Sequence, residues 1–271
     1  MFTNLVDTHC HIHTASSKID SHTVKKWHEA GEKSAEELLK SAKAGGVDKL
    51  ICVGTDYEDS IDAVNFVQAR EGCWSAVGVH PHEAKEFFKE YKDLSEFDKL
   101  IKKPKVAAIG EVGLDYYYEH SPRKEQQKLL EMFLDLAQKH NLPVIFHIRE
   151  AFDDFWPILA NFTKIRGVLH SFTDSEKNLE KAMERRLLVG LNGIMTFTKD
   201  QSQLQTAKKI PLESLLLETD APYLAPKPLR GKICKPEHVR YTYEFLSRLR
   251  GEDEEEFINT VSANVKRLFG V

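Results

Sequence analysis

Histidines and carboxylates that follow short apolar segments are the residues of this sequence that could do chemistry. His9 and His11 end the first such segment, and because residues i and i+2 of a strand point to the same face, both can bind one metal ion. Four more residues of metal-binding type end later segments: Glu111, His147, His170 and Asp220. Six ligands are too many for one tetrahedral ion. They suit two divalent cations that share a carboxylate, for which Glu111 is the central candidate.

Each of these residues also has an ordinary structural interpretation. A single histidine at a strand end, such as His147 or His170, is more often a structural group than a ligand, and Asp220 could cap the next turn. The pair His9-x-His11 is a weak motif, because His11-x-His13 offers a second register. The joint placement at the ends of five predicted strands favours the metal site, since chance would scatter such residues over helices and loops.

Eight apolar segments alternate with segments of helical period and predict the strands that position these residues. The predicted strands are Asn4–His9, Lys49–Val53, Trp74–Val79, Val106–Gly110, Pro143–His147, Gly167–His170, Leu187–Leu191 and Leu215–Thr219. The seventh could instead be the tail of the preceding helix. Eight strand–helix units in 271 residues predict an α/β fold, the (β/α)8 TIM barrel, as one domain over residues 1–271. The carboxyl ends of all strands meet at one face of such a barrel, so the six ligands converge there.

The helices are easier to predict than the strands. Ser121-Pro122 offers a cap and a first-turn proline for a long helix that must end before Leu142-Pro143. Two amphipathic segments, Glu237–Leu249 and Glu254–Phe269, close the chain. Residues 16–30 fit neither a strand nor the first helix and predict a long loop or an extra helical turn.

Composition excludes several classes of protein. With 41% hydrophobic and 30% charged residues, the sequence is typical of an ordinary soluble domain. No apolar run approaches the roughly 18 residues that cross a bilayer, and the N-terminus lacks the pattern of a signal peptide. Four scattered cysteines favour the reducing cytoplasm. A net charge of −4 gives no global attraction to nucleic acid, so binding of an anionic polymer requires a local cationic patch or bound metal.

Several further residues are candidates for contact with a substrate. His80 ends the third predicted strand and could contact phosphate, and Arg149 could clamp phosphate oxygens or pair with Glu150 or Asp153. Glu218 shares a face with Asp220 and either orients a ligand from behind or pairs with a buried basic group. Basic residues crowd the loop after the eighth strand, and tyrosines follow Glu111: Lys227, Arg230, Lys232, Lys235, Tyr116, Tyr117 and Tyr118. Such groups suit single-stranded or frayed ends, although they could equally be a solvated edge.

The motifs of the chain resemble those of the TatD-type metal-dependent DNases of the amidohydrolase superfamily. They run in collinear order from about residue 4 to 270: Asp7-Thr-His9-Cys-His11, Gly78-Val-His80-Pro-His82, Gly110-Glu111-Val-Gly-Leu-Asp115-Tyr116, Pro143-Val-Ile-Phe-His147-Ile-Arg149, His170-Ser-Phe172, Gly193-Ile-Met-Thr196-Phe197, Leu217-Glu218-Thr219-Asp220-Ala-Pro-Tyr-Leu-Ala-Pro226, Arg230-Gly-Lys232 and Asn264 with Leu268-Phe269. Departures follow Phe172 and Lys232, and residues 16–30 look like an insertion, but none of these touches a predicted ligand.

The resemblance implies a set of ligands and an activity. One ion would be held by His9, His11, Glu111 and Asp220, and the second by Glu111, His147 and His170, with His13 left outside. The ions (Zn, Mn, Mg or Ni) would acidify a bridging water, giving hydroxide, and neutralise charge on phosphoryl oxygens. Asp220 is the candidate to accept the proton of that water. The implied protein is a monomeric DNase of exonuclease type, and DNA is its partner.

Two other functions remain open from the sequence alone. The same metals could serve a D-aminoacyl-tRNA deacylase or another ester or amide hydrolase, which assays on carboxyl esters and phosphodiesters would separate. A scaffold that has lost turnover is disfavoured, because no predicted ligand is substituted.

Overall fold

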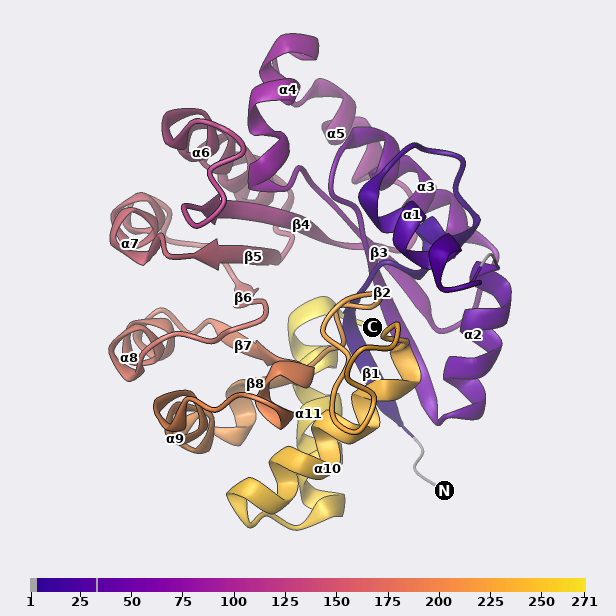
Figure 1. Cartoon of the computed structure of the whole chain (residues 1–271). Helices are drawn as coiled ribbons and strands as arrows, with labels where there is room; N and C mark the ends of the chain where they lie inside the picture. The colour runs from indigo at the N-terminus through magenta and orange to yellow at the C-terminus, as the bar shows by residue number, and fades with distance from the viewer. Residues whose placement is uncertain (1–3, 33) are drawn as a thin grey trace.

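Eight parallel strands form one sheet in the order β1 to β8, and helices surround it (Figure 1). The computed structural model describes residues 4–32 and 34–271; residues 1–3 of the N-terminus considered above lie outside this range. The strands are β1 (Leu5–Cys10), β2 (Val47–Val53), β3 (Cys73–Val77), β4 (Val106–Asp115), β5 (Val144–Arg149), β6 (Gly167–Leu169), β7 (Leu188–Leu191) and β8 (Leu215–Leu217). The predicted α/β barrel is confirmed, including its seventh strand.

Helices follow the strands and pack on the outside of the barrel. The α-helices are α1 (His22–Glu29), α2 (Ala35–Ala44), α3 (Tyr57–Gln68), α4 (Ala84–Glu90), α5 (Ser95–Leu100), α6 (Arg123–His140), α7 (Phe152–Ala160), α8 (Glu176–Glu184), α9 (Gln201–Lys209), α10 (Val239–Arg250) and α11 (Glu254–Phe269). The 3-10 turns are η1 (Ile12–Ser16), η2 (Pro81–Glu83), η3 (Gly193–Thr196), η4 (Leu212–Ser214) and η5 (Pro236–His238). The segment predicted as a loop or helical turn thus contains the end of η1 and all of α1.

Side chains alternate along each strand between the inside of the barrel and the layer under the helices. On β2, Ile51 and Val53 belong to the inner apolar cluster, whereas Leu50 and Cys52 pack in the outer one. This is the period of two that a pleated strand requires. Strand residues from around the barrel join the inner cluster: Val6, Ala76, Ala108, Ile145, Val168 and Leu216. The barrel is therefore filled by side chains, and a site can form only at its mouth.

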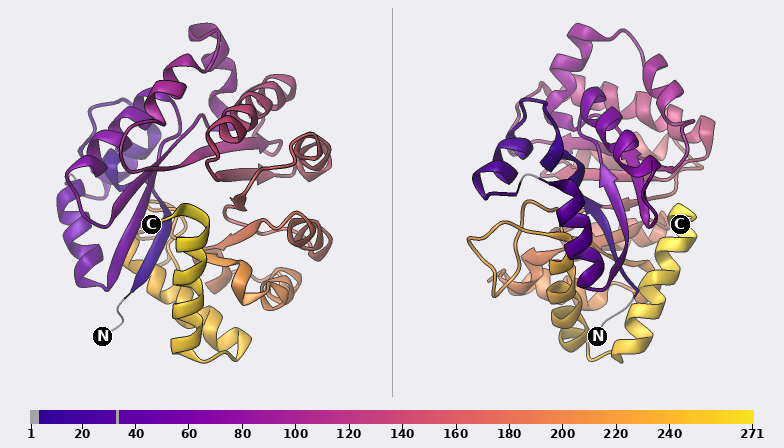
Figure 2. Two further views of the ribbon diagram at one scale, coloured as in Figure 1. Left: turned by 180° about the vertical axis from the view of Figure 1, so that it is seen from behind. Right: turned by 90° about the vertical axis from the view of Figure 1, so that its right-hand side faces the viewer.

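Helix α11 closes the end of the barrel opposite the site. Seen from behind, it crosses the rear of the molecule (Figure 2). The buried side chain of Asn264 donates to the carbonyls of Leu212 (2.7 Å) and Leu215 (2.9 Å) at the start of β8. Three apolar residues of α11 join the inner cluster: Val265, Leu268 and Phe269. The closing Asn…Leu-Phe motif thus seals the amino ends of the strands.

The seam between β8 and β1 is closed by few backbone bonds and by a buried carboxylate. Asp7 accepts hydrogen bonds from the backbone N–H of Thr219 (2.9 Å) and from its hydroxyl (2.5 Å). Backbone bonds continue the seam at the mouth, from Asp220 N–H to the carbonyl of His9 (2.8 Å) and from His11 N–H to that of Ala221 (2.8 Å). These contacts place the start of the Asp-x-His-x-His motif against Asp220.

Strand β4 is longer than predicted, and Glu111 lies within it rather than at its end. The prediction ended this strand at Gly110, but glycine inside a strand often marks a bulge or a close approach of another backbone. The glycines permit close approach to β5: a Cβ on Gly113 would lie 1.9 Å from the carbonyl oxygen of His147, at a φ of +156° that favours glycine. The pairing of β4 with β5 shifts register between Ile109 and Val112, around Glu111. No helix of the described ranges 4–32 and 34–271 could cross a membrane.

Candidate metal centre

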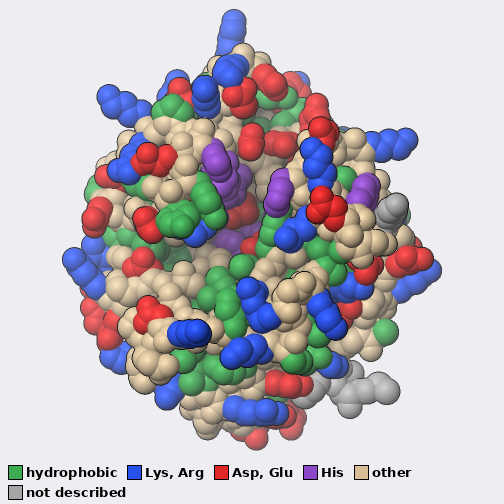
Figure 3. Space-filling model, in the orientation of Figure 1, with side chains coloured by type: hydrophobic (Ala, Val, Ile, Leu, Met, Phe, Trp, Pro, Cys, Tyr) green, Lys and Arg blue, Asp and Glu red, His purple; other side chains and the backbone are tan. Residues whose placement is uncertain are grey.

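Histidine and acidic side chains gather on the floor of a hollow at the carboxyl ends of the strands (Figure 3). Elements far apart in sequence supply them, because His9 belongs to β1, Glu111 to β4 and His147 to β5, whereas His170 and Asp220 follow β6 and β8. His9 is fully buried, and Glu111 and His170 are 4% and 6% exposed. The six residues predicted as ligands therefore converge at the floor, as the barrel requires.

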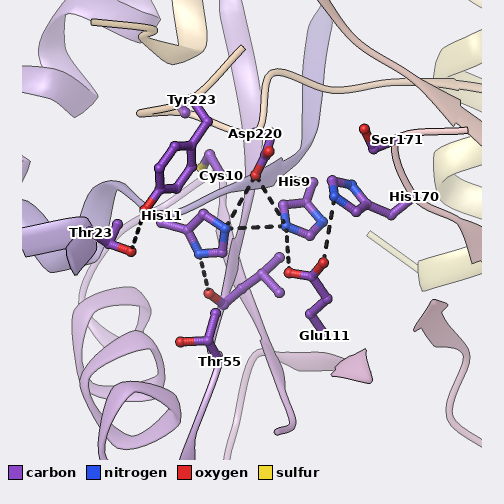
Figure 4. Close-up of polar contacts among 12 residues, drawn as sticks. His9, Cys10, His11, Thr23, Thr55, Glu111, His170, Ser171, Asp220 and Tyr223 are labelled. Carbon is purple, nitrogen blue, oxygen red and sulfur yellow. Dashed lines mark hydrogen bonds and ion pairs between the residues drawn. The ribbon is translucent and has the colours of Figure 1, made fainter. Parts of the chain in front are cut away.

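The first group of ligand atoms has the spacing of a coordination shell (Figure 4). His9 Nε2 lies 3.3 Å from His11 Nε2, 3.4 Å from Glu111 Oε2 and 3.8 Å from Asp220 Oδ1. The distance from His11 Nε2 to Asp220 Oδ1 is 3.5 Å. Ligands about 2.0–2.1 Å from a tetrahedral ion lie roughly 3.3 Å from one another. His9, His11 and Asp220 have the spacing to hold one divalent cation, whereas Glu111 groups with His9 and His170. Ligation of the first ion by Glu111 stays a prediction.

The hydrogen bonds behind these imidazoles also fit a metal. His11 Nδ1 lies 2.7 Å from the carbonyl oxygen of Val53, and since a carbonyl only accepts, Nδ1 carries the proton and the lone pair is on Nε2. His9 Nδ1 is buried without a hydrogen-bond partner among the described residues. The site therefore offers two imidazole nitrogens that face each other, together with two carboxylates. A bound cation would accept electron pairs from all of these groups.

Glu111 also faces histidines on its other side. Its Oε1 lies 3.6 Å from His170 Nε2, 2.7 Å from His147 Nδ1 and 3.9 Å from His80 Nε2. By proximity of ligand atoms, His170 groups with His9 and Glu111, whereas His147 groups with His80 and Glu111. Glu111 is thus central, but the sharing of one ion by His147 and His170 stays a prediction.

Glu218 lies behind His170. Its Oε1 lies 2.9 Å from His170 Nδ1 and accepts from the backbone N–H of Ser171 (2.7 Å) and from the side chain of Asn192 (3.3 Å). Glu218 is 1% exposed. The sequence left two roles open for Glu218, to orient a ligand or to pair with a buried basic group. The contact with His170 fits both roles, because His170 is a buried basic group and a predicted ligand.

Asp115 is a member of the site that the sequence analysis missed. Its Oδ2 lies 3.1 Å from His147 Nε2 and 2.9 Å from His82 Nε2. Its Oδ1 accepts from the backbone N–H groups of Tyr117 and Tyr118, at 3.0 Å each. The indication in the sequence was its spacing from Glu111: two such carboxylates on one strand, four residues apart, share a face.

His80 is held as a hydrogen-bond donor rather than as a ligand. Its Nδ1 accepts from the backbone N–H of His82 (3.2 Å), so the neutral ring carries its proton on Nε2. Burial and the neighbouring His147 lower the pKa of His80 well below its usual value, which keeps the ring neutral. The Nε2–H group therefore faces the floor of the site, 3.9 Å from Glu111.

Arg149 makes neither of the ion pairs that its sequence neighbours offered. Within residues 4–32 and 34–271, no carboxylate pairs with its guanidinium, so Glu150 and Asp153 are not its partners. The guanidinium lies over the rings of Tyr117 and Tyr118, 4.1 and 4.7 Å from their centroids. It is held beside the mouth with its charge unneutralised.

The loop after β8 brings basic residues to the opposite rim. Arg230 lies over the ring of Phe197 (3.8 Å) and donates to the carbonyl of Ala225 (3.0 Å). Lys235 pairs with Glu32 at 2.5 Å, so its charge is neutralised. Four residues of this loop and of α1 meet at the rim: Tyr223, His22, Thr23 and Lys26. The sequence analysis did not predict this contact, because it joins segments about 200 residues apart.

The electrostatics of the floor favour cations. Burial alone would raise the pKa of Glu111, but His9, His170 and the hydrogen bond from His147 hold it well below its usual value. Burial would raise the pKa of Asp220 too, yet His11, His170 and His9 lower it. Burial would lower the pKa of His170, but Glu218 and Glu111 raise it to about 10. The ionised carboxylates thus keep protons on the neighbouring imidazoles. A metal ion that binds here would displace those protons.

The barrel and this donor set define the class of metal-dependent hydrolases that work at the mouth of a TIM barrel. Comparison with known proteins supports the class. The family described as TatD related DNase matches residues 6–270, and the chain belongs to that family. Membership confirms the resemblance stated from the motifs and makes the chain an enzyme that hydrolyses ester bonds.

Individual relatives agree along nearly the whole chain. The "uncharacterized metal-dependent hydrolase YabD" of Bacillus subtilis is 32% identical over 98% of this chain and 99% of its own length. The "3'-5' ssDNA/RNA exonuclease TatD" of Citrobacter koseri is 34% identical over 88% of this chain and 94% of its own. The crystal structure of the TatD homologue YjjV from Escherichia coli covers both chains completely, with a TM-score of 0.85 and 27% identity. A phosphotriesterase homology protein from the same bacterium shares the fold, with a TM-score of 0.68 at 12% identity.

Proposed function

We propose that this chain is a DNase that removes nucleotides from a strand end with two divalent cations at the barrel mouth. The observation that carries the proposal is the spacing of His9, His11 and Asp220, which suits one ion, with Glu111 3.4 Å from His9 on the other side. We further propose that residues 1–271 act as one domain, as a monomer. The four free, buried cysteines support the cytoplasm as its compartment.

The ligand sets proposed are those that the motifs implied. One ion would be held by His9, His11, Glu111 and Asp220, and the other by Glu111, His147 and His170. When bound, the two ions supply an acidified water and neutralise charge on phosphoryl oxygens. Imidazole and carboxylate ligands suit Zn, Mn and Ni, and a carboxylate-rich site can also take Mg.

The remaining chemistry belongs to side chains of the chain. Asp220, ionised and beside the ligand cluster, accepts a proton from the attacking water. His80 donates its Nε2–H to a phosphoryl oxygen, and because the ring stays neutral it does so without a change of protonation. Arg149 clamps phosphate oxygens from its position beside the mouth. Arg230 contacts the substrate backbone from the opposite rim.

The substrate proposed is DNA with a single-stranded or frayed end. A relative that is 34% identical carries the name of a 3'-5' ssDNA/RNA exonuclease, and the unneutralised Arg149 suits a phosphate. The alternative is a D-aminoacyl-tRNA deacylase or another ester or amide hydrolase. The family match to DNases disfavours it.

The proposal is tested by digestion of oligonucleotides labelled at the 3′ or the 5′ end, single-stranded and duplex, with Mg²⁺, Mn²⁺ or Zn²⁺. We expect stepwise shortening from one end, and close to two metal ions per chain by mass spectrometry of the metals. Glu111→Ala should remove most of the metal and reduce kcat/KM by at least a thousandfold, because both ion sites lose their shared ligand.

The matched control is Glu176→Ala, which removes a surface carboxylate paired with Lys209 and should leave metal content and activity at the wild-type level. Nuclease activity that persists in purified Glu111→Ala protein would contradict the proposed mechanism. Cleavage of aminoacyl esters but not of oligonucleotides would contradict the proposed substrate.

A further inference from the structure

Two exposed tyrosines stand at the rim of the metal centre. Among the described residues, Tyr117 and Tyr118 are the large hydrophobic side chains that are exposed, at 54% and 51%. Large aromatic rings are usually buried, and adjacent exposed ones mark binding sites. Hydrophobic and histidine side chains lie side by side at the rim of the central hollow (Figure 3). We call Tyr117, Tyr118 and the Arg149 guanidinium over their rings the aromatic ledge.

Contacts within the protein hold the aromatic ledge in place without a ligand. Both tyrosine N–H groups donate to Oδ1 of Asp115, which is 1% exposed. The two rings meet edge to face, with centroids 4.7 Å apart and planes at 89°. Arg149 lies over both of them. Because the backbone is pinned and the rings are held, a ligand that stacks here loses little entropy to ordering of the protein.

The aromatic ledge is joined directly to the metal centre. Asp115, whose Oδ1 holds the tyrosine backbone, contacts His147 through its Oδ2 at 3.1 Å. On β5, Arg149 lies two residues after His147 and shares its face of the strand. The ring of Tyr118 lies 5.6 Å from that of His82, which in turn lies 4.3 Å from that of His80. A strand whose phosphate lies at the floor would therefore bring its neighbouring base to the ledge.

We propose that the aromatic ledge binds an unpaired nucleobase next to the phosphodiester that is cleaved, and so selects single-stranded ends. This inference rests on the proposed function. Aromatic rings stack on any base, so recognition would be tolerant of sequence. The base would extend the stack that Tyr118 already makes with His120, and the Arg149 charge beside the rings would meet a phosphate of the strand. A paired base cannot leave its stack without the loss of its partner, so a duplex must first fray. The ledge would thus give the enzyme a preference for single strands.

Binding without turnover provides the first test. A single-stranded decanucleotide with 2-aminopurine at its terminal position, mixed with protein in EDTA, should lose fluorescence as the base stacks. Tyr117→Ala/Tyr118→Ala should abolish this quenching and weaken binding roughly 10- to 100-fold, as expected for the loss of base–aromatic stacking. Tyr117→Phe/Tyr118→Phe should retain both, because stacking needs the ring and not the hydroxyl. Unchanged quenching in the alanine variant would overturn the inference.

A second measurement separates stacking from a purely structural effect. Replacement of the terminal nucleotide by an abasic one should weaken binding to the wild type as much as the alanine substitutions do, and should have no further effect on the alanine variant. Tyr241→Ala, on the outer helix α10, is the matched control and should behave as the wild type. If the abasic nucleotide and the alanine substitutions weaken binding additively, the base does not contact the tyrosines.

Catalysis distinguishes failure of this inference from failure of the proposed function. The ratio of kcat/KM for the single-stranded oligonucleotide to that for bis(4-nitrophenyl) phosphate, which has no base, should fall at least tenfold in Tyr117→Ala/Tyr118→Ala. An unchanged ratio with active enzyme would overturn the ledge alone. A wild type that hydrolyses neither substrate with any metal would overturn the proposed function, while the fluorescence test would still judge the ledge.

Discussion

Glu218 is a buried carboxylate that lies directly behind the predicted ligand His170. It receives hydrogen bonds from Ser171 and Asn192, and lies 2.9 Å from His170 Nδ1. A carboxylate behind a ligating imidazole fixes the ring and raises its basicity, and loss of such a group weakens metal binding about 10- to 100-fold.

We therefore expect Glu218→Gln, which keeps the shape but not the charge, to weaken the binding of one ion about 10- to 100-fold and to leave the other much less affected. Titration with metal against a competing chelator measures this. Glu176→Gln serves as the control for loss of a carboxylate elsewhere. Equal weakening of both ions, or no change, would show that Glu218 does not act through His170.

Residue types and their order made the candidate ligands predictable. The hydrogen-bond partners of those ligands could not be predicted. His9, Glu111 and Asp220 could be found because parallel strands bring their carboxyl ends together in any barrel. Asp115 was missed, since its role depends on β4 continuing past two glycines. The tautomer of His80 likewise depends on one backbone N–H, that of His82, whose position only the folded chain fixes.

At the scale of elements, the β8–β1 seam holds the two halves of the first ion site together. Thr219 donates its hydroxyl to the buried Asp7 at 2.5 Å, and the same oxygen accepts from the N–H of Ala221 at 3.1 Å. We expect Thr219→Val to lower the free energy of unfolding by about 1–3 kcal/mol, because it leaves a buried carboxyl oxygen of Asp7 without its hydrogen-bond donor. Unfolding in urea, with EDTA present, measures the change.

Thr206→Val, at a position that is 5% exposed, is the control for loss of a buried hydroxyl. Among the described residues, no side-chain hydrogen bond involves its hydroxyl, so we expect a change within about 1 kcal/mol. A loss at Thr219 no larger than that at Thr206 would show that backbone bonds alone close the seam.

The turn before α10 introduces a pH dependence. His238 Nδ1 accepts from the N–H of Lys235 at 3.1 Å, and burial, with Lys235 and Arg240 nearby, lowers the pKa of His238 to about 4. The unfolded chain, with a pKa near 6.5, binds more protons between these values. The stabilising contribution is therefore complete above about pH 6.5 and is lost as the pH falls toward 4.

We expect the wild type to lose about 1–2 kcal/mol more stability between pH 7.5 and 5 than His238→Gln does; the full pKa shift would give more, but the ring is partly exposed to solvent. Urea unfolding in EDTA at the two pH values gives the difference. His22→Gln, at an exposed histidine, should follow the wild type. Parallel curves for His238→Gln and the wild type would refute the assignment.

Strand existence was more predictable from the sequence than strand length. Apolar runs located all eight strands, because burial on both faces makes each strand of a parallel barrel apolar. The predicted end of β4 was wrong because glycine is ambiguous: it weakens a strand interior, but at Gly113 it admits the carbonyl of His147. Helix α1 was ambiguous because some of its contacts are made with Tyr223, far away in the sequence.

At the scale of the molecule, charge must be considered locally. The net charge of −4 opposes nucleic acid, and many exposed cations are already paired, such as Lys209 with Glu176 and Lys235 with Glu32. Arg149 and Arg230 stand at the mouth over aromatic rings. Only a few phosphates can therefore be neutralised by the protein itself, and the metal ions must supply much of the attraction at the floor.

This limit predicts a shallow salt dependence. Each phosphate neutralised on a single strand contributes about −0.7 to the slope of log K against log salt concentration, so about two to four contacts give a slope between roughly −1.5 and −3 in EDTA. Arg149→Gln should make the slope less steep by about 0.7, whereas Arg240→Gln on α10 should not change it. Fluorescence anisotropy over a range of salt concentrations measures both. A slope steeper than about −5 would require many more phosphate contacts, made by basic residues along an extended surface. The mouth of the barrel would then be only one end of that binding surface.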